Sequence, residues 1–351
     1  MKTRRSAFSA LFFTIRRHIL ANNKVCAQHY SGIGGQAVLE GVMMKNGDRY
    51  AVAVRKEDGS IVLRNETYTG LLSGTPVRKI PIVRGFFVLI DSLVLGLRVT
   101  DYSASMYDPD ETVDPASPRE KFLTGLILAV SMVIAVALFI LLPYGAASFL
   151  SSLIGHTGLL VVFEGILRVT IFLLYIWAIT AMEDIKRLYQ YHGAEHKCIN
   201  CLESGLPLTV ENARKSTRLH KRCGSSFTMF VMLVSIVLFF FIRTDSHIMR
   251  IALRILLIPV ISGVSYEIIR LAGTSSNPLI QLISKPGLWM QLMTTKEPDD
   301  DMIEVGIASV EAVFDWREYL TQEFGVHFDQ EGDPAIGQNI DQAVDPIPGN
   351  A

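Results

Sequence analysis

The 351-residue sequence has few charged residues, few cysteines and almost no net charge. Only 19% of its residues are Asp, Glu, Lys or Arg, half are hydrophobic, and the mean hydropathy is positive. An ordinary soluble domain carries more charge than this. The formal net charge of −1 gives no indication of nucleic-acid binding. The composition therefore predicts a membrane protein.

The cysteines are too few and too unevenly placed for a secreted disulfide framework. Of the four, Cys26 stands alone near the N-terminus, whereas Cys198, Cys201 and Cys223 fall in one short region. This distribution favours reduced thiols, or a metal site, on a reducing face of the membrane.

The first 31 residues have no acidic side chain but several basic ones. Their apolar patch, residues 7–15, is too short to span a bilayer and ends at Arg16 and Arg17 without a small-residue cleavage pattern. We predict a basic N-terminal arm over residues 1–31 on the cytoplasmic side. An organellar transit peptide is the alternative.

Residues 32–75 complete no G-x-G-x-x-G fingerprint, although they begin with a glycine-rich stretch. They contain three β-like runs separated by Asn-Gly-Asp and Asp-Gly turn signals, at residues 36–44, 50–56 and 61–69. This pattern predicts a small cytoplasmic β-meander. Three strands are barely stable alone, so the meander should pack against the rest of the protein.

Residues 76–120 are predicted to form an interfacial helix followed by a polar loop. Arg84, Asp91 and Arg98 are seven residues apart each time, so the three charges fall on one side of a helix. A helix with one charged side fits the membrane surface or the edge of a bundle better than it fits a free span.

Four apolar segments follow, which we pair into transmembrane hairpins at 121–182 and 227–266. The segment at 122–142 is free of charge and long enough to cross a bilayer about 30 Å thick. The segment at 159–181 contains Glu164 and Arg168, four residues apart on one helical face. We expect an internal salt bridge between them; a polar lining is the alternative reading.

Basic residues predict the orientation of these spans. Residues 143–158 contain neither Lys nor Arg, whereas residues 183–226 contain eight of them. By the positive-inside rule, residues 183–226 and both termini should lie in the cytoplasm, with the chain a multi-pass protein of the cell (inner) membrane. The basic groups should lie near anionic lipid headgroups. They lack interleaved aromatic residues, so nucleic acid is not an expected partner.

After the last span, residues 267–331 are predicted to form cytoplasmic helices. From Asp301 onward there are eleven acidic residues and one basic residue, Arg317. Residues 332–351 have the composition of a disordered acidic tail. The expected fold is thus an α-helical polytopic membrane protein, with about four transmembrane helices and a small α+β cytoplasmic domain.

One stretch within residues 183–226 concentrates side chains that bind soft metals. Six such residues fall within 32 positions: His192, His196, Cys198, Cys201, His220 and Cys223. His192, Glu195 and His196 have the H-x-x-E-H order, in which two histidines on one helical face hold zinc and the glutamate polarises a water molecule. With Cys223 or His220 as third ligand, this is an open catalytic site with Glu195 as general base.

The same residues allow a second, closed arrangement. Cys198-x-x-Cys201 and His220-x-x-Cys223, separated by eighteen residues, have the spacing of a four-ligand structural zinc site. The first arrangement predicts a membrane-bound, zinc-dependent hydrolase. The second predicts a scaffold or assembly factor that recruits protein partners at the cytoplasmic membrane face, for example around translocation machinery. A transporter, suggested by Glu164, Arg168 and Asp91, is the third hypothesis.

Several separated blocks of the sequence resemble the bacterial YqhQ-like family of membrane proteins, whose function is unknown and which is commonly labelled a predicted metal-dependent enzyme. The resemblance covers roughly residues 32–314. The blocks are residues 35–44, Arg84-Gly85, residues 192–197, Arg214 with His220 and Arg222-Cys223-Gly224, and residues 296–300. The resemblance implies that His192, Glu195, His196, His220 and Cys223 belong to the family pattern. It leaves the basic arm and the acidic tail outside.

Overall fold

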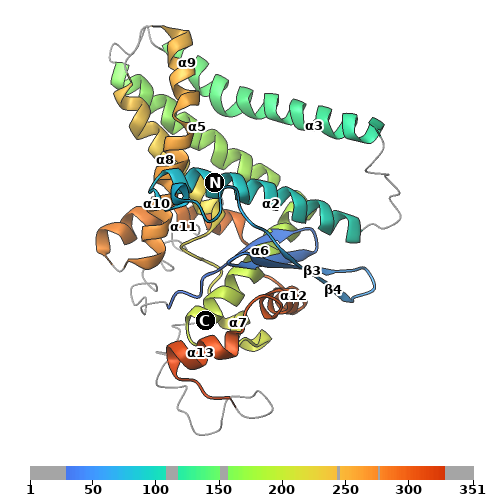
Figure 1. The fold of residues 1–351 in the computed structure, drawn as a ribbon. Helices are drawn as coiled ribbons and strands as arrows, with labels where there is room; N and C mark the ends of the chain where they lie inside the picture. Colours follow the sequence, from blue (N-terminus) through green and yellow to red (C-terminus); the bar gives the residue numbers. More distant parts are fainter. Residues whose placement is uncertain (1–28, 108–117, 151–156, 243–245, 276, 329–351) are drawn as a thin grey trace, which may run out of the picture.

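The computed structural model describes residues 29–107, 118–150, 157–242, 246–275 and 277–328. Figure 1 shows a group of long helices at one end and, at the other, a small sheet with helices packed around it. The predicted acidic tail and all but the last three residues of the predicted basic arm lie outside the described residues.

The sheet has four antiparallel strands in sequence order, not the three that were predicted. They are β1 (Ile33–Val38), β2 (Gly41–Asn46), β3 (Arg49–Arg55) and β4 (Ile61–Thr67). The run at 36–44 is not one strand because the chain reverses at Leu39-Glu40, where Glu40 has φ of 49° and Val38 pairs with Gly41. Arg187 and Tyr191 donate hydrogen bonds to the buried Glu40 carboxylate, which fixes this unusual backbone.

Both faces of the sheet are covered. Alternate residues of β2 and β3 point to opposite sides. Val42 and Ala53 join a core formed with α6 (Glu183–Glu203) and α12 (Asp300–Glu311). Their neighbours Met43 and Val52 join a second core with α2 (Val83–Tyr107). The small sheet is therefore held between helices from distant parts of the chain.

Helix α2 lies between the sheet and the long helices (Figure 1). It follows the 3₁₀ turn η1 (Pro76–Lys79). Arg84 makes a two-pronged ion pair with Glu267 of α10 (Ile258–Thr274), and the backbone of α10 comes close at Gly85. A Cβ on Gly85 would lie 2.9 Å from Cα of Gly263. At Arg84, the charged side of α2 thus faces another helix of the same chain.

In the described part of the chain, three helices are long and apolar enough to cross a membrane, and a bent pair makes a fourth candidate. The first is α3 (Pro118–Val136), which continues through the π-helical turn η2 (Ala137–Leu141) into α4 (Leu142–Phe149). The others are α5 (Thr157–Ile179) and α8 (Gly224–Phe241). The second predicted hairpin, at 227–266, does not end in one continuous span: α9 (His247–Leu256) meets α10 at a bend of 42°, and Pro259 stands in the first turn of α10.

Residues 183–226, predicted as a loop, are built around the 21-residue helix α6. Helix α7 (Val210–Lys215) follows it. Beyond the bundle come α11 (Pro278–Thr294), α12 and α13 (Trp316–Phe324). Helices α6, α7, α12 and α13 share one apolar core with the sheet. The H-x-x-E-H stretch therefore lies inside a packed domain.

Candidate metal centre

Helix α6 carries the H-x-x-E-H stretch through the middle of the domain. Glu183 and Asp184 occupy its first turn, where negative charge is favoured, and no proline interrupts it. Gly193 allows the segment after α11 to lie directly on the helix: a Cβ there would come within 2.0 Å of the Lys296 carbonyl oxygen. Thr294, the last residue of α11, lies just before this segment and places its carbonyl group next to His192.

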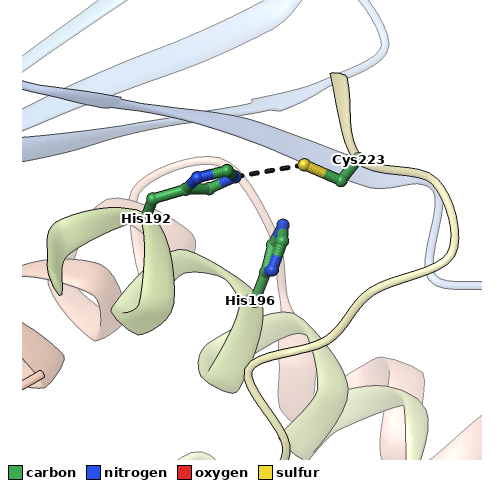
Figure 2. Close-up of side chains that lie close together, drawn as sticks. All are labelled: His192, His196 and Cys223. Atoms are coloured by element: carbon green, nitrogen blue, oxygen red, sulfur yellow. Dashed lines mark hydrogen bonds between the residues drawn. The ribbon is translucent and has the colours of Figure 1, made fainter. Parts of the chain in front are cut away.

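His192, His196 and Cys223 come together at one point. Figure 2 shows the two imidazoles on successive turns of α6, facing the thiol of Cys223, which lies on the segment before α8. The Nε2 atom of His192 is 3.1 Å from Sγ of Cys223. One potential ligand atom of each residue lies within 4.8 Å of the others. In the described part of the chain this is the one cluster of three or more such side chains that could hold a metal ion.

Backbone carbonyl groups fix the tautomers of both histidines. Nδ1 of His192 is 2.9 Å from the Thr294 carbonyl oxygen, and Nδ1 of His196 is 2.6 Å from that of Arg218. A carbonyl only accepts, so each Nδ1 carries a hydrogen, and the Nε2 atom of each ring faces the cluster, where it offers a lone pair whenever the ring is neutral. The same arrangement orients histidine ligands in metal sites.

The Nε2 atom of His196 is buried and has no hydrogen-bond partner among the residues that the structure describes. Leaving such an atom unsatisfied costs free energy, so native proteins rarely do so without a reason. A metal ion between the three residues would engage this lone pair together with the other two ligand atoms. The cluster therefore fits a metal on the chemistry of its donors.

The charge states of Cys223 and His192 depend on each other. Burial acts to raise the pKa of Cys223, but the neighbouring imidazoles His192 and His196 hold it well below its usual range. Burial likewise acts to lower the pKa of His192, while the Cys223 sulfur and then Glu195 raise it to about 9. The site therefore favours a thiolate, which is the form that binds metal.

Glu195 lies beside the cluster but is not one of its three members. Its Oε2 atom is 4.0 Å from Nε2 of His192. Burial raises the pKa of its carboxyl group, and the two histidines and the backbone N–H of Gly35 oppose that rise. A buried carboxyl group at this distance is placed to accept a proton from a water molecule held at the cluster.

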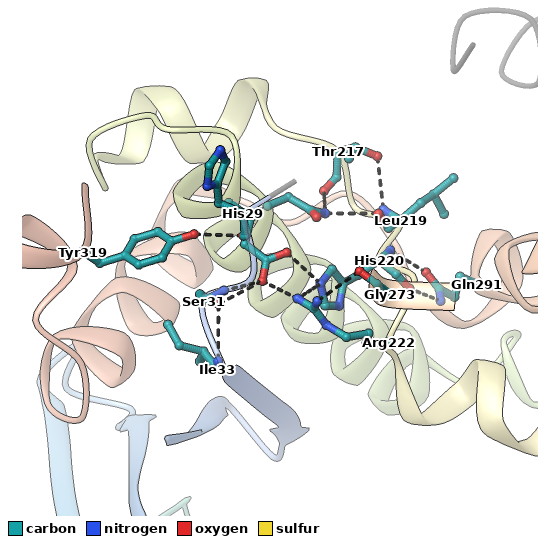
Figure 3. A network of polar contacts seen from close by, with 12 residues as sticks. His29, Ser31, Ile33, Thr217, Leu219, His220, Arg222, Gly273, Gln291 and Tyr319 are labelled. Carbon is teal, nitrogen blue, oxygen red and sulfur yellow. Dashed lines mark hydrogen bonds and ion pairs between the residues drawn. The ribbon is translucent and has the colours of Figure 1, made fainter. Parts of the chain in front are cut away.

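His220 belongs to a neighbouring network rather than to the cluster. Its Nε2 atom is 3.5 Å from Oε2 of Glu203, and Gln291 bonds both its backbone N–H and its carbonyl oxygen. Glu203 also accepts hydrogen bonds from Arg222 and from the hydroxyl and backbone N–H of Ser31. Figure 3 shows Ser31, His220 and Arg222 converging in this network. This network fixes the segment of the chain that leads into Cys223.

Cys198 and Cys201 lie elsewhere, in the apolar core. The thiol of Cys198 points to the Ile303 carbonyl oxygen at 3.8 Å, and that of Cys201 to the Pro207 carbonyl oxygen at 3.4 Å. Burial raises the pKa of both thiols, for Cys201 to about 12. The structure therefore does not bring together the four residues of the closed arrangement.

The sequence did not point to several residues that shape the site. Thr294 and Arg218 act through their carbonyl groups, which carry no sequence signal. Glu203 accepts hydrogen bonds from Ser31 and Arg222 and lies 3.5 Å from the His220 ring. The one signal available for it was its helical spacing, seven residues after His196.

Comparison with known proteins gives the following matches. The family model described as "Protein of unknown function (DUF1385)" matches residues 80–316. The uncharacterized protein YqhQ of Bacillus subtilis (strain 168) is 36% identical over 286 residues, covering 79% of this chain and 90% of the relative. No solved structure matches.

Proposed function

This chain belongs to the YqhQ-like family of proteins of unknown function (DUF1385), and we propose that it is a zinc-dependent hydrolase of the cell membrane. His192, His196 and Cys223 would hold the ion, and Glu195 would act as general base. The site would face the cytoplasm, together with both termini.

One observation carries the proposal: the partly buried imidazole of His192 and the buried one of His196, both held by Nδ1 to carbonyl groups, present Nε2 to a thiol on another segment. Two histidines and one cysteine are a donor set that suits zinc, and three protein ligands leave a fourth position open. Zinc in such a site supplies Lewis acidity, which makes a coordinated water molecule acidic near neutral pH.

The chain's own residues have separate roles in this proposal. The Thr294 and Arg218 carbonyl groups orient the imidazoles. Glu195 is too far from His192 for a direct hydrogen bond at 4.0 Å, yet close enough to reach a water molecule between them. Its carboxylate would take the proton of that water. Its raised pKa suits a group that must also release the proton again.

The membrane location is supported by composition and by helix lengths. Among the described residues, three to four helices are long and apolar enough to cross a bilayer. Eight basic residues at 183–226 favour the cytoplasm for the domain that carries the site.

A second candidate function is a scaffold in which the metal only braces the fold. The depth of the cluster favours it: His196 is fully buried, and Glu195 and Cys223 are 5% and 7% exposed. A metal there would link α6 to the start of α8, as structural sites do. The two functions differ in the role of Glu195, because a structural metal site does not need a general base.

The first test is the zinc content of the full chain purified in detergent, measured by elemental mass spectrometry. We expect about one zinc per wild-type chain, little in Cys223→Ser or in His192→Ala with His196→Ala, and an unchanged amount in Cys198→Ser with Cys201→Ser. Circular dichroism checks that each variant is folded. No zinc in freshly purified wild type, or loss only in the Cys198/Cys201 variant, would overturn the open site.

Glu195→Gln separates the two functions. Because Glu195 is not a ligand in this proposal, the variant should keep its zinc. Hydrolysis, once a substrate class is found by screening, should fall by a factor of about 100 to 10,000, as for loss of a general base. The scaffold hypothesis expects the same zinc content and no effect on any function of the cell that depends on the chain.

A further inference from the structure

A second cluster of charges lies within the long helices, far from the metal centre. Glu164 on α5 forms ion pairs with two arginines, Arg168 one turn along the same helix and Arg254 on α9. The Nη2–Oε1 distance to Arg168 is 2.7 Å, and both Nη atoms of Arg254 lie 2.8 Å from the carboxylate. The salt bridge expected between Glu164 and Arg168 is present, but it has a third member.

The cluster carries an excess of one positive charge. Two guanidinium groups share one carboxylate, and no other carboxylate in the described part of the chain makes an ion pair with either arginine. Glu164 is 5% exposed, and the two arginine side chains are each 12% exposed. An uncompensated charge among apolar helices is costly, so the cluster calls for an anion.

Both arginines are also held in place by contacts to groups other than Glu164. Arg168 also donates from Nε to the Phe139 carbonyl oxygen, 3.1 Å away in the π-helical turn η2. The faces of the Arg254 guanidinium lie against the Tyr144 and Phe239 rings, with centroids 5.3 and 5.0 Å away. Glu164 accepts from two of the five N–H groups of the Arg254 guanidinium. Within the described residues the other three have no acceptor.

The π-helical turn is a second, independent sign of a built site. Such turns interrupt the regular hydrogen-bond ladder of an α-helix and are frequent at functional sites. Here the turn presents the Phe139 carbonyl oxygen to Arg168 from the helix that faces α5. It holds the guanidinium at a fixed place beside Glu164.

The position of the cluster indicates which anion it meets. Figure 1 places α9 and the beginning of α5 at the end of the bundle farthest from the sheet. Glu164 and Arg254 each lie seven residues from the start of their helix, about 10 Å along it. Side chains lean toward the start of a helix, so these groups reach toward that end. In a membrane this end lies near the phospholipid headgroups of the outer half.

We propose that Arg168 and Arg254, with Glu164 between them, bind the phosphodiester of one anionic phospholipid in the half of the bilayer opposite the metal centre. Arginine forks match phosphate oxygens in geometry and stay charged at all relevant pH values. The proposal rests on the membrane location proposed above. It does not depend on zinc.

The test uses the full chain in detergent and intact-complex mass spectrometry with added phosphatidylglycerol or phosphatidylcholine. Wild type should retain one phosphatidylglycerol per chain under conditions that remove phosphatidylcholine. Arg254→Gln leaves a neutral Glu164–Arg168 pair and should weaken phosphatidylglycerol binding at least tenfold. Glu164→Gln raises the excess charge and should retain or strengthen binding. Arg270→Gln, which removes one exposed arginine elsewhere, is the matched control and should bind like wild type.

Opposite effects of Arg254→Gln and Glu164→Gln distinguish a binding site from a purely structural ion cluster. If Glu164→Gln does not fold, Arg168→Gln replaces it and should weaken binding as Arg254→Gln does. Equal binding of both lipids, wild-type binding by Arg254→Gln, or displacement of the lipid by millimolar inorganic phosphate would overturn the proposal. Zinc content should not change in any of these variants, so a failure here is separate from a failure at the metal centre.

Discussion

The backbone of Gly35 lies against the side chain of Glu195. A Cβ placed on Gly35 would come 2.8 Å from Cγ of Glu195 and 2.7 Å from the Met43 carbonyl oxygen. The glycine-rich start of the sheet is thus the wall that positions the proposed base. At Gly34, one residue earlier, an added Cβ meets nothing within 4 Å.

Gly35→Ala should therefore destabilise the protein, while Gly34→Ala should not. The added methyl group at position 35 contacts backbone that cannot move aside, and overpacking of this kind costs about 1 to 3 kcal/mol. Thermal unfolding in detergent, followed by circular dichroism, compares the two variants. Equal melting temperatures would show that β1 does not press on α6 as described.

The network around Glu203 should control zinc affinity without supplying a ligand. Arg222→Gln removes the donor that ties the segment before Cys223 to Glu203, and loss of such supporting contacts typically weakens metal binding about 10- to 100-fold. Lys221→Gln makes the same charge change one residue earlier, at a side chain that forms no ion pair with any described residue, and is the control. Competition with a chromogenic chelator gives both affinities. An equal affinity of both variants would contradict this role.

Alkylation should distinguish the three buried cysteines in the centre of the chain. After zinc is removed by a chelator, Cys223 should react slowly with iodoacetamide and become protected when zinc is restored. Cys198 and Cys201 should stay unmodified in both states, because burial raises the pKa of their thiols. Peptide mass spectrometry identifies the labelled positions. Zinc-dependent protection of Cys198 and Cys201 alone would point back to the closed arrangement.

The ion pair between Arg84 and Glu267 should hold α2 to α10. Arg84→Glu places two carboxylates together at a site where both side chains are about one-fifth exposed, and we expect a loss of about 1 to 3 kcal/mol. Combining it with Glu267→Arg restores opposite charges and should recover most of the loss. Melting temperatures of both single variants and the double variant complete the cycle. No recovery in the double variant would show that the side chains act separately.

Local patterns predicted the parts of this protein that depend on short spacings. The interval of four between His192 and His196 placed both on one helical face, and the uninterrupted apolar runs gave the candidate spans. The choice between Cys223 and His220 could not be made in advance, because it depends on how the chain travels between α6 and α8. Gln291 and Glu203 decide it by holding His220 away from the cluster.

The features that the sequence did not predict also depend on contacts between residues far apart in the chain. The reversal at Glu40 breaks a run that reads as one strand, and it is stabilised by Arg187, a residue far along the chain. Arg254 lies in an apolar run whose local pattern indicates no partner for it. Its partner, Glu164, lies ninety residues earlier and is reached only once α5 and α9 pack side by side. Pairings over such distances have no signature in local sequence.

Cys223 has two tasks at once, since its sulfur also accepts the Ser225 N–H and so caps the first turn of α8. The cysteine of the candidate centre is thus the N-cap of a helix that is a candidate span. Any tilt or axial shift of α8 would move one ligand while the two on α6 stay still. The geometry of the centre would then depend on the thickness and lateral pressure of the surrounding lipid. Zinc affinity measured in bilayers of short-chain and of long-chain lipids would reveal that mechanical coupling.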